Sequence, residues 1–140
     1  MGGIRALVAD DEPIIRNIVR RYLRRFGCEA HEVASVPEAR EVLEREADTF
    51  GLVVTDHRMP GGTGHELIDW IRMRWASLPI ILMSGGFSEP LPPGALVRTL
   101  EKPFSGDTFA DVIRELLGPS EHGAIARPAE CSGPGAWRLV

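Results

Sequence analysis

The chain has few cysteines, no long hydrophobic run and no large excess of either charge. Its 140 residues contain two cysteines, Cys28 and Cys131, whose separation fits no metal-binding pattern, so we expect a reduced, cytoplasmic protein. No apolar run approaches the roughly 20 residues that cross a bilayer, and the N-terminus lacks the apolar core of a secretory signal. A net charge of −4 argues against a nucleic-acid surface. We therefore expect neither a membrane nor a nucleic acid among its partners.

The remaining composition, 44% apolar and 26% charged, is that of an ordinary globular domain. Short apolar runs alternate along the chain with stretches of helical periodicity. The expected strands are Ile4–Ala9, Cys28–Ala34, Leu52–Asp56, Pro79–Met83 and Leu96–Leu100. The expected helices are Ile14–Phe26, Pro37–Ala47, Gly64–Trp75 and a final helix that Ser105 caps. This alternation predicts a flavodoxin-like, doubly wound five-stranded parallel sheet in a three-layer α/β/α sandwich.

Two segments depart from the regular alternation. Between the fourth and fifth expected strands, Phe87–Ala95 carries three prolines, so we expect the fourth helix to be short or irregular. Residues 118–140 hold four glycines and three prolines in 23 positions, which passes the roughly 25–30% that is typical of disordered segments. The expected organisation is one domain over residues 4–117, followed by a flexible C-terminal tail over 118–140 and without an output domain in this chain.

Polar side chains follow four of the expected strands, and a parallel sheet gathers such residues at one edge. Asp10 and Asp11 follow the first strand, Asp56 ends the third, Ser84 follows the fourth and Lys102 the fifth. Carboxylates at about 4 Å repel one another by roughly 1 kcal/mol per pair in water and by roughly 4 kcal/mol near a dielectric of 20. A divalent cation relieves this repulsion, and oxygen ligands suit Mg²⁺. Taken singly these residues are ordinary caps, turn residues and surface charges. Together they favour a site in which a carboxylate attacks phosphorus.

Four motifs follow one another along the chain in a specific order. They are Asp10-Asp11, Asp56 with Met59-Pro60 and Gly64, Ser84-Gly85, and Lys102-Pro103-Phe104. This set resembles the receiver domain of two-component response regulators over roughly residues 4–117. The resemblance implies that Asp56 accepts a phosphoryl group from a phosphohistidine in a reaction that requires Mg²⁺ or Mn²⁺. It implies a phosphoacceptor that catalyses its own phosphorylation and dephosphorylation, and not an enzyme acting on another substrate.

The resemblance also assigns the metal ligands. Asp11, Asp56 and the main-chain carbonyl of Arg58 would bind the metal ion directly, while Asp10 would act through water. Arg58 and Gly86 stand two residues after the phosphoacceptor and two residues after the expected phosphoryl-binding serine. The family tunes the lifetime of the phosphoryl group at these two positions, and we hypothesise that Arg58 shields the acyl phosphate from water.

Ser84 and Lys102 are implied to hold the phosphoryl oxygens, and the peptide bond between Lys102 and Pro103 is expected to be cis. The family's conformational switch pairs the Ser84 position with an aromatic residue three positions before the lysine. That position holds Thr99 in this chain, so the usual coupling lacks its large moving part. We expect the chemistry to be intact and the signalling readout to be unusual.

The implied partner is a histidine kinase or a histidine phosphotransfer protein. In the family such partners dock around the first helix and the loop after the fifth strand, which here means Ile14, Ile15 and Ile18 together with the Pro103-Phe104 loop. The first helix also has an arginine-rich face, which is either a solvated surface or a part of the docking face. We expect a monomer or a weak dimer.

Three functional classes remain open. The first is a phosphoacceptor receiver, which is a single-domain response regulator, a phosphorelay intermediate or a receiver excised from a hybrid histidine kinase; a flanking catalytic domain would decide among these. The second is a phosphorylation-independent interaction module with a receiver fold, which the retention of all the site residues disfavours. The third is a phosphatase or hydrolase with an aspartyl nucleophile, which would need a second general acid and a substrate pocket that are not evident.

Overall fold

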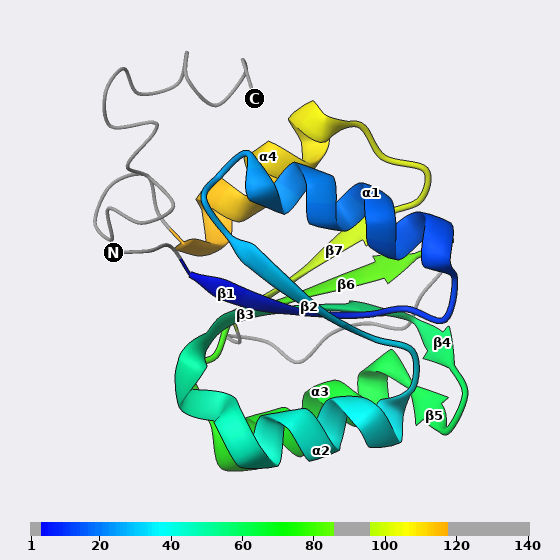
Figure 1. Ribbon diagram of the computed structural model, residues 1–140, viewed down its shortest axis with the longest axis vertical. Coiled ribbons are helices and arrows are strands. Elements are labelled where there is room, and N and C mark those ends of the chain that lie inside the picture. The colour runs from blue at the N-terminus through cyan, green and yellow to red at the C-terminus, as the bar shows by residue number, and fades with distance from the viewer. Residues whose placement is uncertain (1–3, 86–95, 118–140) are drawn as a thin grey trace.

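The computed structural model describes residues 4–85 and 96–117, which form a five-stranded parallel sheet with helices on both faces (Figure 1). The strands are β1 (Arg5–Ala9), β2 (Glu29–Val33), β3 (Phe50–Asp56), β6 (Ile80–Ser84) and β7 (Val97–Glu101). They lie side by side in the order β2-β1-β3-β6-β7, and every neighbouring pair is parallel. The order reverses between β1 and β3, which makes the edge above these two strands the switch point of a doubly wound fold.

Two described helices cover each face of the sheet (Figure 1). The first layer consists of α1 (Pro13–Arg24) and α4 (Gly106–Leu117), and the second of α2 (Val36–Glu46) and α3 (Gly64–Arg74). The sequence placed each of these strands and helices within two residues of its observed bounds, so the predicted flavodoxin-like, three-layer sandwich is confirmed. None of the helices in the described ranges combines the length and hydrophobicity needed to cross a membrane.

The prediction of a short or irregular fourth helix concerns a segment that lies outside the described residues. The same is true of the predicted flexible tail over residues 118–140. Both stay predictions.

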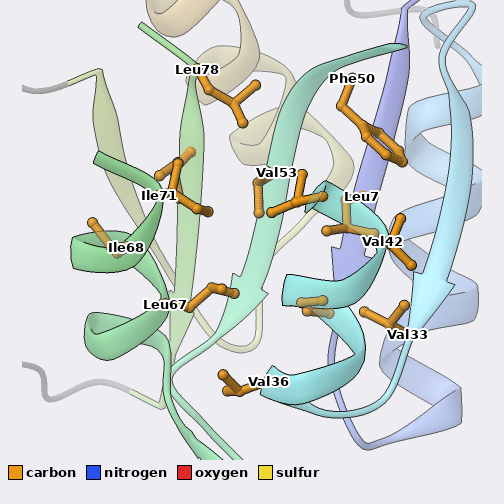
Figure 2. Packing of buried hydrophobic residues seen from close by; sticks show 14 of the residues in the cluster. Leu7, Val33, Val36, Val42, Phe50, Val53, Leu67, Ile68, Ile71 and Leu78 are labelled. Atoms are coloured by element: carbon orange, nitrogen blue, oxygen red, sulfur yellow. The ribbon is translucent and has the colours of Figure 1, made fainter. Parts of the chain in front are cut away.

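Burial on both faces explains why the central strands read as continuous apolar runs. Successive side chains of a strand point to opposite faces, so Val8 and Val54 pack beneath α1 and α4, while Leu7 and Val53 pack against α2 and α3. Figure 2 shows the second layer, in which apolar side chains of α2 and α3 close over Leu7 and Val53. The sheet is therefore held from both sides, and its strand ends form a rigid edge.

Side-chain caps fix the starts of the helices near that edge. The hydroxyl of Ser105 accepts the N–H of Thr108 at 3.1 Å, which confirms the predicted cap before α4. At α3 the hydroxyl of Thr63 accepts the N–H of Glu66, and the Glu66 carboxylate accepts the N–H of Thr63, both at 3.1 Å. This second, reciprocal cap was readable in the sequence as a Thr-x-x-Glu pattern.

Three short elements were not predicted. β4 (Arg58–Met59) and β5 (Gly62–Thr63) form a small antiparallel hairpin directly after β3, and η1 (Ala47–Thr49) is a 3₁₀ turn before it. Gly61 turns the hairpin with a φ of 89°, a left-handed conformation that glycine adopts without strain. Elements of two or three residues are too short to carry a hydrophobic period, so the sequence pattern gives no sign of them.

Cys28 lies in the core beneath α1 and α4 with 4% of its surface exposed. Burial raises the pKa of its thiol to about 12. A thiol with so high a pKa is protonated at neutral pH and unreactive. Cys131 lies outside the described residues.

Candidate functional site

The parallel sheet brings the predicted polar residues to one edge. Ala9 of β1 lies opposite Thr55 of β3 in the strand register, so Asp10 and Asp56, each one residue further on, emerge side by side at the switch point. From the other half of the sheet, the N–H of Lys102 donates to the carbonyl of Ser84 at 2.7 Å. That bond extends the pairing of β6 with β7 up to the residue that reaches across the edge.

Lys102 joins the two carboxylates that flank the switch point. Its Nζ lies 3.1 Å from Oδ1 of Asp56 and 3.3 Å from Oδ2 of Asp10. The exposed fractions of the three side chains are 20% for Lys102, 13% for Asp56 and 0% for Asp10, so water screens these contacts only weakly. Burial of Lys102 lowers its pKa, but the hydrogen bond to Asp56 and the charges of Asp10 and Asp56 outweigh that effect and raise the pKa above its ordinary value. The lysine is therefore a permanent cation in the pocket.

Three carboxylates gather beside this lysine. Asp10, Asp11 and Asp56 each present an oxygen, and these oxygens all lie within 4.8 Å of one another. Burial is the main cause that raises the pKa of Asp10; the nearby Asp56 charge adds to it, while the N–H of Glu12 and the Lys102 ammonium oppose it. The pocket thus retains uncompensated negative charge, and its hard oxygen donors, with the exposed Asp11 on the solvent side, fit Mg²⁺ or Mn²⁺.

Backbone donors orient the two central carboxylates. The N–H of Glu12 donates to Oδ1 of Asp10, and the N–H of His57 donates to Oδ1 of Asp56, both at 2.8 Å. The carbonyl of His57 in turn accepts the N–H of Gly64, the first residue of α3, at 2.7 Å. The loop after β3 is thereby fastened to the start of α3, and the Asp56 carboxylate is held in one orientation.

The other predicted site residues whose positions are described lie on β4, β6 and β7. Ser84 is buried at the end of β6 and Arg58 is exposed on β4, one residue beyond His57. Thr99 is exposed on β7, an edge strand of the sheet. The peptide bond between Lys102 and Pro103 is cis, as predicted. Gly86 lies outside the described residues.

The sequence did not predict the groups that orient the site carboxylates by hydrogen bonds. The N–H groups of Glu12 and His57 belong to the backbone, so no side-chain pattern announces them. Arg16, which the helical period places on a charged face, donates to the main-chain carbonyl of Asp10 at 2.7 Å. The sequence gives no signal for this contact beyond the position of Arg16 on the charged side of the helix.

The fold and the pocket together define a flavodoxin-like α/β protein with an acidic, lysine-containing pocket at its switch point. The response regulator receiver domain family matches residues 6–114, and the chain belongs to this family.

Relatives of known identity agree with this assignment. The chain is 36% identical over 116 residues to the C4-dicarboxylate transport transcriptional regulatory protein DctD of Pseudomonas aeruginosa, a match that covers 79% of this chain and 24% of that protein. The chain thus spans about a quarter of the length of such curated relatives.

Solved structures show the same fold. The receiver domain of the hybrid histidine kinase CckA is 31% identical, with a TM-score of 0.69 and coverage of 81% of this chain and 98% of that one. The receiver domain of a sensor histidine kinase from Pseudomonas aeruginosa PAO1, solved with a magnesium ion coordinated in its active-site cleft, is 20% identical with a TM-score of 0.71. It covers 83% of this chain and 98% of that one, and this likeness shows the fold alone.

Asp10→Asn is expected to stabilise the metal-free protein at neutral pH. Because the folded pKa of Asp10 is raised, its ionisation costs stability as the pH rises from the unfolded carboxyl pKa of about 3.9 through the raised folded value. An amide removes that charge and keeps an oxygen acceptor for the N–H of Glu12. By calorimetry in EDTA at pH 7, the Tm should rise by roughly 3–5 °C, equivalent to about 1 kcal/mol.

The gain from Asp10→Asn should shrink as the pH falls towards the ordinary carboxyl range, where Asp10 is protonated in both the folded and the unfolded state. Asp69→Asn, at an exposed position on α3, is the matched control and should leave the Tm unchanged. A lower Tm for Asp10→Asn than for the wild type in EDTA at pH 7 would contradict the cost assigned to the buried Asp10 charge.

Gly64→Ala is expected to destabilise the protein and to disturb Asp56. A Cβ at Gly64 would lie 2.4 Å from the Asp56 carbonyl oxygen and 2.6 Å from Cδ1 of Leu82. Because the carbonyl belongs to the backbone, the clash is relieved only by moving the loop, at a cost of about 1–3 kcal/mol in the free energy of unfolding by urea. Gly85→Ala, whose Cβ would meet nothing within 4 Å, is the control. Equal losses in the two variants would contradict the close approach.

Proposed function

We propose that residues 4–117 form a receiver domain that accepts a phosphoryl group from a phosphohistidine onto Asp56 in a Mg²⁺-dependent reaction, with residues 118–140 as a tail. The observation that carries this proposal is the contact of one lysine with the buried Asp10 and the partly buried Asp56, beside a third carboxylate, at the switch point of the sheet. A cationic Lys102, a divalent cation site and an oriented carboxylate are the parts that phosphoryl transfer to an aspartate requires.

In the proposed transfer, a carboxylate oxygen of Asp56 attacks the phosphorus of the phosphohistidine. The phosphorus–nitrogen bond breaks, its electron pair leaves with the imidazole, and the imidazole takes a proton from solvent. Lys102 and the Ser84 hydroxyl would bind the phosphoryl oxygens and stabilise their charge. The signal ends by hydrolysis of the acyl phosphate. Water attacks the phosphorus, the bond between phosphorus and the Asp56 oxygen breaks, and inorganic phosphate and the free carboxylate form.

The metal would be held by this chain's own oxygens. We propose Asp11, Asp56 and the main-chain carbonyl of Arg58 as direct ligands and Asp10 as a ligand through water. When bound, Mg²⁺ or Mn²⁺ would neutralise charge on the phosphoryl oxygens. The cluster of three carboxylate oxygens within 4.8 Å supports this assignment.

A histidine kinase or a histidine phosphotransfer protein is the proposed donor, in a cytoplasmic setting in which the protein is a monomer or a weak dimer. Ile14 is 73% exposed at the start of α1, while Ile15 and Ile18 are partly buried. The centroid of the Phe104 ring lies 6.2 Å from that of Tyr22 on α1, so the Pro103-Phe104 loop packs against α1. An exposed apolar side chain at the start of α1, the helix that follows the strand end carrying Asp10, suits contact with such a donor.

The CckA likeness supports one of the narrower alternatives, a receiver that belongs to a hybrid histidine kinase, while the likeness to DctD supports a receiver that belongs to a response regulator. Thr99 leaves the phosphorylation-independent interaction module as the remaining alternative, because a small exposed side chain replaces the family's switch aromatic. Phosphorylation of Asp56 would separate the receiver from the interaction module, and a flanking kinase domain would identify the hybrid kinase.

Incubation with acetyl phosphate and Mg²⁺ should add one phosphoryl group to the wild-type chain, measured as intact mass. Asp56→Asn removes the nucleophile and should gain nothing, and EDTA should abolish the gain in the wild type. Asp69→Asn, whose carboxylate lies on the exposed surface of α3, is the matched control and should be modified like the wild type. A folded, Mg²⁺-binding wild type that gains no mass would overturn the proposal in favour of the interaction module.

Arg58 is proposed to lengthen the life of the acyl phosphate by shielding it from water, and Gly86 shares this proposed tuning role. Arg58 is exposed on β4, two residues after Asp56, so truncating its side chain removes no buried packing. Arg58→Ala should shorten the half-life of the phosphorylated protein severalfold at unchanged Tm, followed by intact mass after removal of acetyl phosphate. An unchanged half-life would remove Arg58 from this role.

A further inference from the structure

Arg16 on α1 reaches from the charged face of its helix to the back of the acidic pocket. Its Nη1 donates to the main-chain carbonyl of Asp10 at 2.7 Å, and its Nε donates to Oε1 of Glu32 on β2 at 3.1 Å. The Arg16 side chain is only 19% exposed. The guanidinium thus links three elements of the fold, α1, β2 and the end of β1, at the point where the pocket begins.

The carbonyl that Arg16 holds is part of the peptide that joins Asp10 to Asp11. Because a peptide unit is planar, fixing its carbonyl also fixes the position from which the Asp11 side chain leaves. The N–H of Asp10 donates to the carbonyl of Val33 at 3.1 Å, and its Oδ1 accepts the N–H of Glu12 at 2.8 Å. Arg16 adds a third bond, because it donates to the main-chain carbonyl of Asp10.

Glu32 in turn holds Arg16. One Glu32 oxygen accepts Nε of Arg16 at 3.1 Å, and the other lies 3.3 Å from Nε of Arg20. Glu32 is 33% exposed, so these ion pairs contribute little stability by themselves. The geometry of these contacts orients the Arg16 guanidinium: Glu32 accepts its Nε on one side, and its Nη1 is thereby directed at the Asp10 carbonyl on the other.

We propose that Arg16 is a positioning residue for the divalent cation site, acting by fixing the Asp10–Asp11 peptide so that both carboxylates face the metal. The proposal rests on the proposed function, since it assumes that these carboxylates bind Mg²⁺. It makes a prediction opposite in sign to a purely electrostatic role. As a charge, Arg16 repels a divalent cation, and its removal would tighten Mg²⁺ binding. As a positioning residue it orders the ligands, and its removal weakens binding.

The test compares Mg²⁺ affinity, by calorimetric titration, in wild type, Arg16→Ala, Arg16→Lys and Arg20→Ala. Loss of an outer-shell partner costs about 10–100-fold in metal affinity, so Arg16→Ala should bind Mg²⁺ at least about tenfold more weakly than wild type. Arg20→Ala is the matched control, because Arg20 shares the Glu32 carboxylate but has no contact with Asp10 among the described interactions. It should bind Mg²⁺ within about twofold of wild type.

Arg16→Lys separates geometry from charge. Lysine keeps the positive charge but has a single point donor in place of the planar fork, so its Mg²⁺ affinity should fall between those of wild type and Arg16→Ala. The same order should hold for the Mg²⁺ concentration that half-saturates the rate of phosphorylation by acetyl phosphate, while the rate at saturating Mg²⁺ stays close to that of wild type.

Tighter or unchanged Mg²⁺ binding in Arg16→Ala overturns the inference, as does an Arg20→Ala variant that loses as much affinity as Arg16→Ala. In both cases a wild type that binds Mg²⁺ and gains a phosphoryl group leaves the proposed function standing. A wild type that neither binds Mg²⁺ nor gains mass overturns the proposed function and this inference with it.

Discussion

The structure depends on the confinement of three carboxylates within 4.8 Å at the end of a parallel sheet. The two charges of each carboxylate pair repel one another in a pocket where water screens them weakly. Lys102 compensates two of the charges directly, and the N–H groups of Glu12 and His57 each stabilise one carboxylate. The pKa of Asp10 is nevertheless raised, first by burial of the carboxyl and then by the nearby Asp56 charge. The folded protein therefore contains a locally unfavourable charge arrangement that a bound cation would relieve, and the remaining stability must come from elsewhere.

The two apolar layers supply that stability, and they also set the geometry of the pocket. Central strands that are buried on both faces cannot slip in register without exposing one apolar layer and misplacing the other. The parallel register of β1 with β3 then fixes Asp10 beside Asp56, and the pairing of β6 with β7 fixes Ser84 beside Lys102. Gly64 completes the edge, since the close approach of α3 to the Asp56 carbonyl leaves no room for a Cβ. The site is rigid because the sheet beneath it is rigid.

The same reasoning explains what the sequence could predict. Apolar runs followed by Asp10, Asp56 and Lys102 imply a shared edge, because alternating strands and helices allow only a parallel sheet with all strand ends on one side. The contacts made by backbone groups were beyond such reasoning: the hairpin of β4 and β5 is too short to show a period, and the N–H of His57 has no sequence signature. The helical periodicity places Arg16 on the charged face of α1. Such periodicity separates an apolar face from a polar one, but it does not say which polar residues turn towards a neighbouring strand.

α1 brings two roles together within one turn of helix. Ile14 is exposed next to the strand ends, whereas Arg16, two residues later, is turned inward to Glu32 and to the Asp10 carbonyl. A partner that presses on the exposed side of α1 therefore contacts the same rigid element that holds the acidic pocket from behind. The β7 edge of the sheet lacks a comparable connection at residue 99. Thr99 is small and exposed, so it cannot transmit a change by moving a large ring in and out of the core. Within residues 4–85 and 96–117, α1 thus joins the acidic pocket, through Arg16, to a surface that exposes Ile14.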